Sequence, residues 1–429
     1  MKYLPIGKEL FIQNRAKFIS KLQSNSIAIF QSSDIMPTSA DGTMPFKQDA
    51  NIFYMSGIDQ EESILLLAPE FPDERLREVL FLRETNDQIA IWEGHKYTKA
   101  EATEASGIKT VKWLSEFEST LNSILAETDH IYLDSNEHIR NGSQVETRTD
   151  RFVNWCQSQY PLHKYHRIAP LIYDLRCVKE QREIELIQHA CDITEIGFRR
   201  ILEFTKPGVW EYELEAELSY EFLRNRATRF AYDPIIASGG NSCVLHYIEN
   251  NKQCHDGDII LFDVGAEYAN YNADMTRVIP VNGKFTKRQR QVYDAVLRVK
   301  NEATELLAPG SSIPEYHKAV GEIMTKELMA LGLLSKTDVE KQDPNYPAYK
   351  KYFMHGTSHH LGLNVHDVAS IYKKFEPGMV FTVEPGIYIP EENIGIRLED
   401  NIVITKDGHI NLMRNIPIHA DEIESLMNA

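Results

Sequence analysis

The stretch ILFDVGAEYANYNADMTR, residues 260–277, carries two aspartates, Asp263 and Asp274, on either side of an expected turn. The flanking runs, 259–264 and 275–281, are rich in β-branched residues and are typical of strands. A hairpin centred on that turn places the two carboxylates directly opposite each other on one face. Like charges in that arrangement destabilise a sheet unless a cation lies between them, so the stretch indicates a cation site.

A second pair of carboxylates repeats this pattern further along the chain. Glu384 lies in GMVFTVEPGIY and Glu399 in GIRLEDNIVIT, on either side of an expected turn near Glu391. His359 lies between the two pairs, in the segment HGTSHHLGLNVHD. The register of each hairpin is open at this stage, because a slip of one residue turns one partner to the other face.

These residues form a coherent donor set for metal ions. The set has four carboxylates and one imidazole: Asp263, Asp274, His359, Glu384 and Glu399. Four negative charges balance two divalent ions, and hard oxygen donors suit Mn, Mg or Co better than a thiophilic metal. Two ions sharing a water would lower its pKa and provide a hydroxide nucleophile near neutral pH. The pattern therefore indicates a hydrolase.

Length and composition narrow the class of protein. The 429 residues suggest two domains, and 42% hydrophobic with 25% charged residues is ordinary for a globular enzyme. A net charge of -17 argues against a nucleic-acid surface. The five cysteines have no CxxC spacing, which favours free thiols in a reducing compartment. We find neither an apolar signal segment nor a run long enough to span a membrane, so the cytoplasm is expected.

The chain reads as an α/β protein with a boundary near residue 170. We expect a domain over 1–170 and a second over 171–429. In the first, short buried strands are expected at 27–30, 63–68, 79–82 and 131–133, and helices at 11–22 and 116–125. In the second, helices are expected at 179–204, 211–226, 287–307 and 313–331, and an exposed loop at 336–351, which contains two prolines.

The order Asp, Asp, His, Glu, Glu in these contexts resembles the pita-bread metallopeptidases of family M24. That family comprises methionine aminopeptidase, prolidase and aminopeptidase P. In the N-terminal half, PFKQDANIFYMSGIDQEESILLLAP (45–69) and IWEGHKYT (91–98) are similar to the aminopeptidase P N-terminal domain, which methionine aminopeptidase lacks. The resemblance implies an α/β (α+β) chain, with a creatinase-like N-terminal domain followed by a catalytic pita-bread domain.

The resemblance also implies how the metal ligands are shared. Asp263 would be the terminal ligand of one metal, and Asp274 and Glu399 would bridge both. His359 and Glu384 would complete the other site, and Glu384 would also exchange a proton with the bridging water. The cofactor would be two divalent metal ions, Mn²⁺ first, with Co²⁺ or Zn²⁺ as alternatives.

Further residues match positions around the family's cleft. His246 and His366 match catalytic histidines that contact the scissile peptide, and a structural hydrogen bond is the alternative role for each. Tyr232, His355 and Arg397 match the group that shapes the pocket for the substrate's proline ring. Arg397 has a second interpretation, since a guanidinium beside the carboxylates would neutralise them.

The function implied is hydrolysis of the N-terminal Xaa-Pro bond of peptides by a hydroxide that bridges the two metals. The partners implied are peptides with proline second and further copies of the chain, as a dimer or tetramer, with no nucleic acid and no membrane. The alternative is prolidase, which applies the same metal site to dipeptides. A non-catalytic pita-bread binding module is a third reading, which retention of all five ligand residues disfavours.

Overall fold

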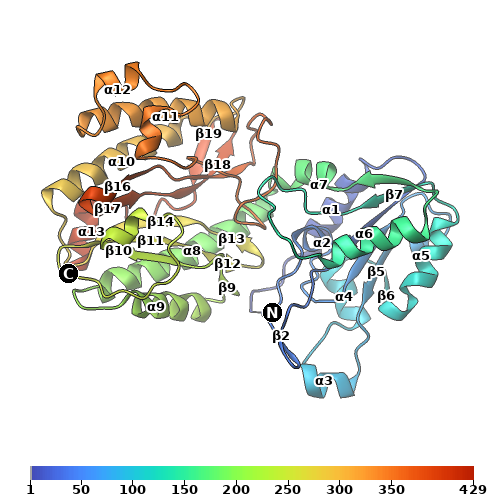
Figure 1. Cartoon of the computed structure of the whole chain (residues 1–429). Coiled ribbons are helices and arrows are strands. Elements are labelled where there is room, and N and C mark those ends of the chain that lie inside the picture. The colour runs from blue at the N-terminus through green and yellow to red at the C-terminus, as the bar shows by residue number, and fades with distance from the viewer. Residues whose placement is uncertain (1) are drawn as a thin grey trace. The chain divides into compact units, whose positions relative to one another are not determined.

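The structure, a computed structural model, describes residues 2–429 and divides into two compact units. Residues 3–176 form the first, and Lys2 groups with residues 177–429 in the second. Helices and strands are mixed in both units, as Figure 1 shows, in agreement with the expected α/β class. The division falls after α7 (Ala169–Arg176), whereas the sequence placed it at the start of that helix.

The first unit is built on a six-stranded sheet in the order β6-β5-β4-β1-β7-β8. Its strands are β1 (Ser26–Gln31), β4 (Ile64–Leu67), β5 (Glu78–Leu82), β6 (Thr110–Trp113), β7 (His130–Leu133) and β8 (Lys164–Arg167). Its helices are α1 (Lys8–Ile19), α2 (Ala50–Ser56), α3 (Asp87–Glu93), α4 (Lys99–Ser106), α5 (Phe117–Leu125), α6 (Arg148–Gln159) and α7, and a small hairpin joins β2 (Pro37–Ser39) to β3 (Gly42–Thr43). The four strands and two helices expected from the sequence are confirmed.

Strand β1 is buried along its whole length because both faces of the sheet are covered. Ile27 and Ile29 pack in a core with Leu121 of α5 and Cys156 of α6. On the opposite face, Phe30 meets Phe18 of α1, with ring centroids 5.3 Å apart. The alternation of side chains along the strand thus supplies two hydrophobic layers.

The second unit places helices on two sides of short antiparallel sheets (Figure 1). α8 (Gln181–Phe204) and α9 (Glu211–Arg224) lie on one side, and α10 (Lys287–Glu305) lies on the other, next to α11 (Ile313–Ala330). The remaining elements are β9 (Arg229–Phe230), β10 (Ile235–Ser238), β11 (Ile259–Val264), β12 (Ala266–Tyr268), β13 (Tyr271–Asn272), β14 (Met275–Pro280), α12 (Lys336–Glu340), β15 (Val380–Val383), β16 (Gly386–Ile389), β17 (Ile394–Arg397), β18 (Asp400–Thr405), β19 (Gly408–Asn411) and α13 (Ala420–Met427).

The four helices expected in this unit are confirmed, but the loop expected over 336–351 is only partly a loop. α12 forms because Ser335 caps it, with its side chain accepting a hydrogen bond from the amide of Asp338. A short 3₁₀ turn follows at Ala348–Lys351. Along residues 2–429, no helix is both long enough and apolar enough to cross a membrane.

The first carboxylate hairpin has a register two residues away from the expected one. Asp263 on β11 pairs directly with Thr276 on β14, and not with Asp274. The reason is the turn, which falls at Ala269 and Asn270, where both φ angles are left-handed at 52° and 66°. Because the shift is two residues, the aspartates still share one face and are diagonal neighbours.

The second hairpin has the expected register. β15 pairs with β18 so that Val383 faces Asp400, and β16 pairs with β17 so that Gly386 faces Arg397. The β15–β18 and β16–β17 ladders have the same register, although the pairing is interrupted between them. Glu384 and Glu399 lie in this interruption, opposite each other. In both hairpins, therefore, the acidic residues lie at or beside an interruption of the strand ladders.

Gly265 marks the interruption in the first hairpin. A Cβ atom at this position would lie 1.9 Å from the carbonyl oxygen of Ala273, the residue before Asp274. The two backbones approach too closely for any side chain, so Gly265 is required for the local geometry that presents Asp274.

We expect Gly265→Ala to lower the free energy of unfolding of the second unit by about 2 kcal/mol or more, because the backbones must separate. Denaturant or thermal unfolding would measure this. Gly142→Ala is the control, since a Cβ there meets nothing within 4 Å. Equal stability of the two variants would contradict the assignment.

Candidate metal centre and active site

Tyr232 joins the first pair of carboxylates. Its hydroxyl oxygen lies 2.6 Å from Oδ1 of Asp263 and 2.6 Å from Oδ1 of Asp274. A hydroxyl has one hydrogen and can donate it fully to only one of these oxygens. The other close oxygen contact is favourable only if a proton or a cation neutralises the carboxylates, which fits a cation site.

Arg397 connects the two hairpins. Its Nη2 lies 2.5 Å from Oδ2 of Asp263, its Nε donates to Thr276 at 3.0 Å, and its Nη1 donates to Tyr388 at 2.8 Å. Thr276 in turn donates its hydroxyl to Oε2 of Glu399 at 2.6 Å. All three nitrogens of the buried guanidinium are thus occupied by protein groups.

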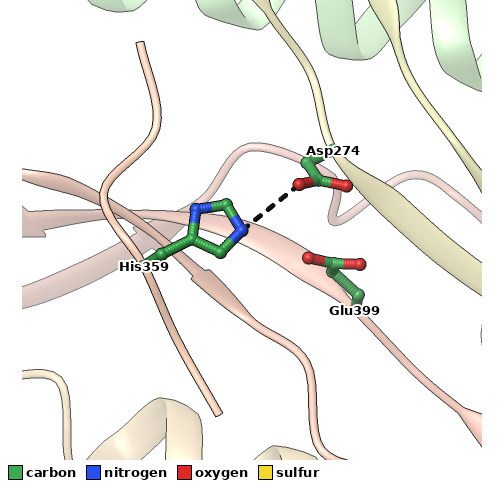
Figure 2. Close-up of side chains that lie close together, drawn as sticks. All are labelled: Asp274, His359 and Glu399. Carbon is green, nitrogen blue, oxygen red and sulfur yellow. Dashed lines mark ion pairs between the residues drawn. The ribbon is translucent and has the colours of Figure 1, made fainter. Parts of the chain in front are cut away.

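His359 presents a ring nitrogen to the carboxylates. Its Nδ1 donates to the carbonyl oxygen of His360 at 2.9 Å, which leaves a lone pair on Nε2. Nε2 lies 3.4 Å from Oδ2 of Asp274 and 3.7 Å from Oε1 of Glu384. Figure 2 shows His359, Asp274 and Glu399 pointing toward one another, and one donor atom from each lies within 4.8 Å of the others.

The carboxylates of this cluster would be stabilised in their charged form by bound cations. Burial, followed by the neighbouring carboxylates, raises the pKa of Glu399 well above its usual range. Burial also raises the pKa of Glu384 to about 7 and raises the pKa of Asp263. Carboxylates with such raised pKa values bind protons near neutral pH unless bound cations take the place of the protons. Oxygen donors with one imidazole are a set that divalent metal ions accept, so the residues fit a metal centre.

The predicted cleft histidines lie around the same cluster. His366 is exposed, and its ring meets that of His359 edge to face, with centroids 4.5 Å apart. His355 places Nε2 2.7 Å from the Tyr388 hydroxyl and Nδ1 3.6 Å from Glu384. Burial is the main cause that lowers the pKa of His355 to about 3, and nearby positive charge, including that of the exposed His246, contributes.

All ten predicted site residues lie in the part of the chain that the structure describes, although they are not equally close to one another. Asp274, His359 and Glu399 form the compact trio. The other members adjoin it through the contacts given above: Asp263, Glu384, Tyr232, His355, His366, Arg397 and, through its charge on His355, His246.

Three residues of the site were missed from the sequence. Thr276 and Tyr388 provide the contacts to Arg397 described above, and Asn401 fixes the backbone of Asp274. The Asn401 side chain accepts from the amide of Asp274 at 3.0 Å and donates to its carbonyl at 2.6 Å. Each lies an even number of residues from a ligand on the same hairpin arm, so strand alternation was the available signal.

Comparison with known proteins gives two family matches. The sequence model of Metallopeptidase family M24 matches residues 185–406, the part that contains the whole cluster. The model of the aminopeptidase P N-terminal domain matches residues 11–132. The two matches follow the order expected from the sequence.

Individual proteins match along nearly the full chain. The Xaa-Pro aminopeptidase of Haemophilus influenzae is 35% identical, covering 99% of this chain and 98% of its own length. That of Escherichia coli strain K12 is 36% identical, again covering 99% and 98%. The solved structure of E. coli aminopeptidase P with the inhibitor Pro-Leu has a TM-score of 0.87 at 34% identity, covering 99% of both chains.

We expect the stabilisation by divalent metal to grow between about pH 6 and pH 8. The raised carboxylate pKa values mean that the metal-free folded state holds protons that the unfolded chain has released. Its stability therefore falls as pH rises toward and through about 7, the pKa of Glu384. Bound metal replaces those protons and removes the loss.

The measurement is the Tm of metal-stripped protein with and without Mn²⁺ at several pH values. A difference in Tm that stays constant, or that shrinks as pH rises, would contradict the cluster as the metal centre.

Proposed function

The chain belongs to metallopeptidase family M24, and we propose that it is an Xaa-Pro aminopeptidase, which removes the first residue of a peptide whose second residue is proline. The observation that carries the proposal is the convergence of Asp274, His359 and Glu399 in a chain that matches Xaa-Pro aminopeptidases from end to end. The family implies divalent metal ions.

We propose that two divalent ions would be held by five residues: Asp274 and Glu399 would serve both ions, Asp263 one of them, and His359 and Glu384 the other. The oxygen-rich donor set favours Mn²⁺ over thiophilic metals. When bound, such ions activate water and polarise a carbonyl group. Arg397 and Tyr232 would hold Asp263 and Asp274 in place for this.

The chemistry required of the protein follows from the substrate. The bond before proline is a tertiary amide, so its nitrogen has no hydrogen and must receive a proton to depart. Glu384 is the proposed acid and base: it takes a proton from the attacking water and passes it to the proline nitrogen. Water is thereby added across the C–N bond, which breaks to give the carboxylate of the first residue and the free secondary amine of proline.

We propose that His366 and His246 contact the reacting peptide, because both are exposed beside the buried cluster. His355 and Tyr232 would face the proline ring. We propose an indirect part for Arg397, since its nitrogens are bonded to Asp263, Thr276 and Tyr388. It neutralises the carboxylates and orients the groups that form the pocket.

Three further proposals concern the compartment, the partners and the oligomeric state. The five cysteines form no disulfide within residues 2–429, which supports a reducing compartment such as the cytoplasm. The net charge of -17 supports a protein without a nucleic-acid partner. A homodimer or tetramer, and the lack of a membrane partner, stay predictions for light scattering and fractionation to test.

The test of function is a matched series of substrates: an Xaa-Pro dipeptide, its tripeptide extension and the tripeptide with alanine in place of proline. We expect the tripeptide to have the highest kcat/KM, and the alanine analogue to be at least about tenfold worse because the pocket is poorly filled. Turnover of the dipeptide alone would mean a prolidase. No turnover by the Mn²⁺-loaded protein would mean a binding module.

We expect His366→Ala to lower kcat by on the order of 100-fold while metal content stays normal, because a contact to the reacting peptide is lost. Steady-state kinetics with elemental analysis would measure both. His409→Ala is the control, as His409 lies on β19, outside the cluster. An unchanged kcat with a lower Tm would show that His366 is structural.

A further inference from the structure

We propose that Glu211 is a positioning residue that clamps the segment 238–252 and thereby sets His246 against the active site. The inference rests on the proposed function for its catalytic consequence, whereas the clamp itself is a matter of contacts. Glu211 is the first residue of α9 and is 0% exposed, in spite of its charge. α9 lies against β10, the strand that leads into the segment (Figure 1).

The carboxylate of Glu211 receives four hydrogen bonds from three places along the segment. Oε1 accepts from the amide of Ser238 at 2.8 Å and from its hydroxyl at 2.6 Å. Oε2 accepts from the hydroxyl of Tyr247 at 2.7 Å and from the amide of Lys252 at 2.9 Å. One side chain therefore holds the segment at three points, Ser238, Tyr247 and Lys252.

A carboxylate is the group that this arrangement demands. Burying a charge is unfavourable unless hydrogen bonds replace its hydration, and here all four contacts come from donors. Glutamine has a single acceptor oxygen, and its NH₂ group would face donors such as the Lys252 amide. The position at the first turn of a helix also favours negative charge.

The clamp bears on the active site through two links. His246 directly precedes Tyr247, whose hydroxyl is one of the four donors. Nearer the start of the segment, Ser242 accepts a hydrogen bond from the amide of Gly395 at 2.8 Å. Gly395 belongs to β17, the strand that carries Arg397, so the segment is anchored both to Glu211 and to the carboxylate hairpins.

The position of His246 thus depends on the clamp while its own side chain stays exposed to meet a substrate. A displacement of about 1 Å at a catalytic group is enough to cost on the order of 100-fold in rate. Loss of the clamp should therefore act on turnover through His246, and not through metal binding.

A double-mutant cycle on the Mn²⁺-loaded full chain tests this, with kcat/KM on an Xaa-Pro-Xaa tripeptide as the measurement. We expect Glu211→Gln to lower kcat/KM by about tenfold or more with normal metal content. In the His246→Ala background the same change should cost less than about twofold, because the clamp has nothing left to position. Equal losses in both backgrounds, or no loss in either, would overturn the proposal.

Glu217→Gln is the matched control. It removes a charge from the same helix, and its partner is Arg200 at 2.6 Å, away from the segment. We expect it to leave kcat/KM unchanged. If Glu211→Gln does not fold, Tyr247→Phe removes one of the four donors and enters the same cycle under the same criteria.

Amide hydrogen exchange separates the clamp from the proposed function. Glu211→Gln should raise exchange within 238–252, whereas Glu217→Gln should not. This comparison remains decisive if the wild-type protein cleaves no Xaa-Pro peptide, in which case the proposed function fails by itself. Unchanged exchange in the segment would overturn the clamp, whatever the activity.

Discussion

Mutual repulsion among four carboxylates, two of them buried and two half-buried, is the constraint on which the second unit depends. Asp263, Asp274, Glu384 and Glu399 come from two hairpins that approach each other at interruptions in their strand ladders. Burial raises the pKa of most of them, so the cluster is unfavourable without cations. The neighbouring polar groups hold these carboxylates in position through hydrogen bonds and ion pairs, and bound metal ions would neutralise their charge.

Some of these polar groups contact the carboxylates directly, and others lie beneath the hairpins. Arg397 and Thr276 touch the carboxylates themselves, while Asn401 holds the backbone of one of them. Beneath the hairpins, the buried Asp400 lies between Arg277, at 2.6 Å, and Lys300. A buried carboxylate with two cations is satisfied within the protein, which distinguishes it from its neighbour Glu399. An acidic side chain is therefore paired within the protein at Asp400 and is a proposed metal ligand at Glu399, since strand alternation sends the two side chains to opposite faces.

The segments that bring histidines to the cluster are held in a similar way, by buried charge away from the metal centre. Glu211 clamps the segment of His246. On the segment that carries His359 and His366, Asp367 forms an ion pair with Lys179 at 3.0 Å, with both side chains 1% exposed. Each such group is costly to bury unless it is fully paired, so it favours a single loop conformation. The exposed histidines that we propose to contact the substrate thus lie on segments that are held by buried charged side chains.

The sequence by itself determined the six helices and the strands named at the outset, together with the register of the second hairpin, because these depend on local periodicity and on a turn centred between its two acidic residues. It also predicted the ligand set from residue type. It did not determine the register of the first hairpin, where the left-handed angles of Ala269 and Asn270 move the turn by one residue. Nor did it reveal that Arg397 donates hydrogen bonds to Asp263, Thr276 and Tyr388, or that Glu211 accepts one from Tyr247. These are contacts between side chains distant in sequence, and only the packed tertiary structure brings their atoms within hydrogen-bonding distance.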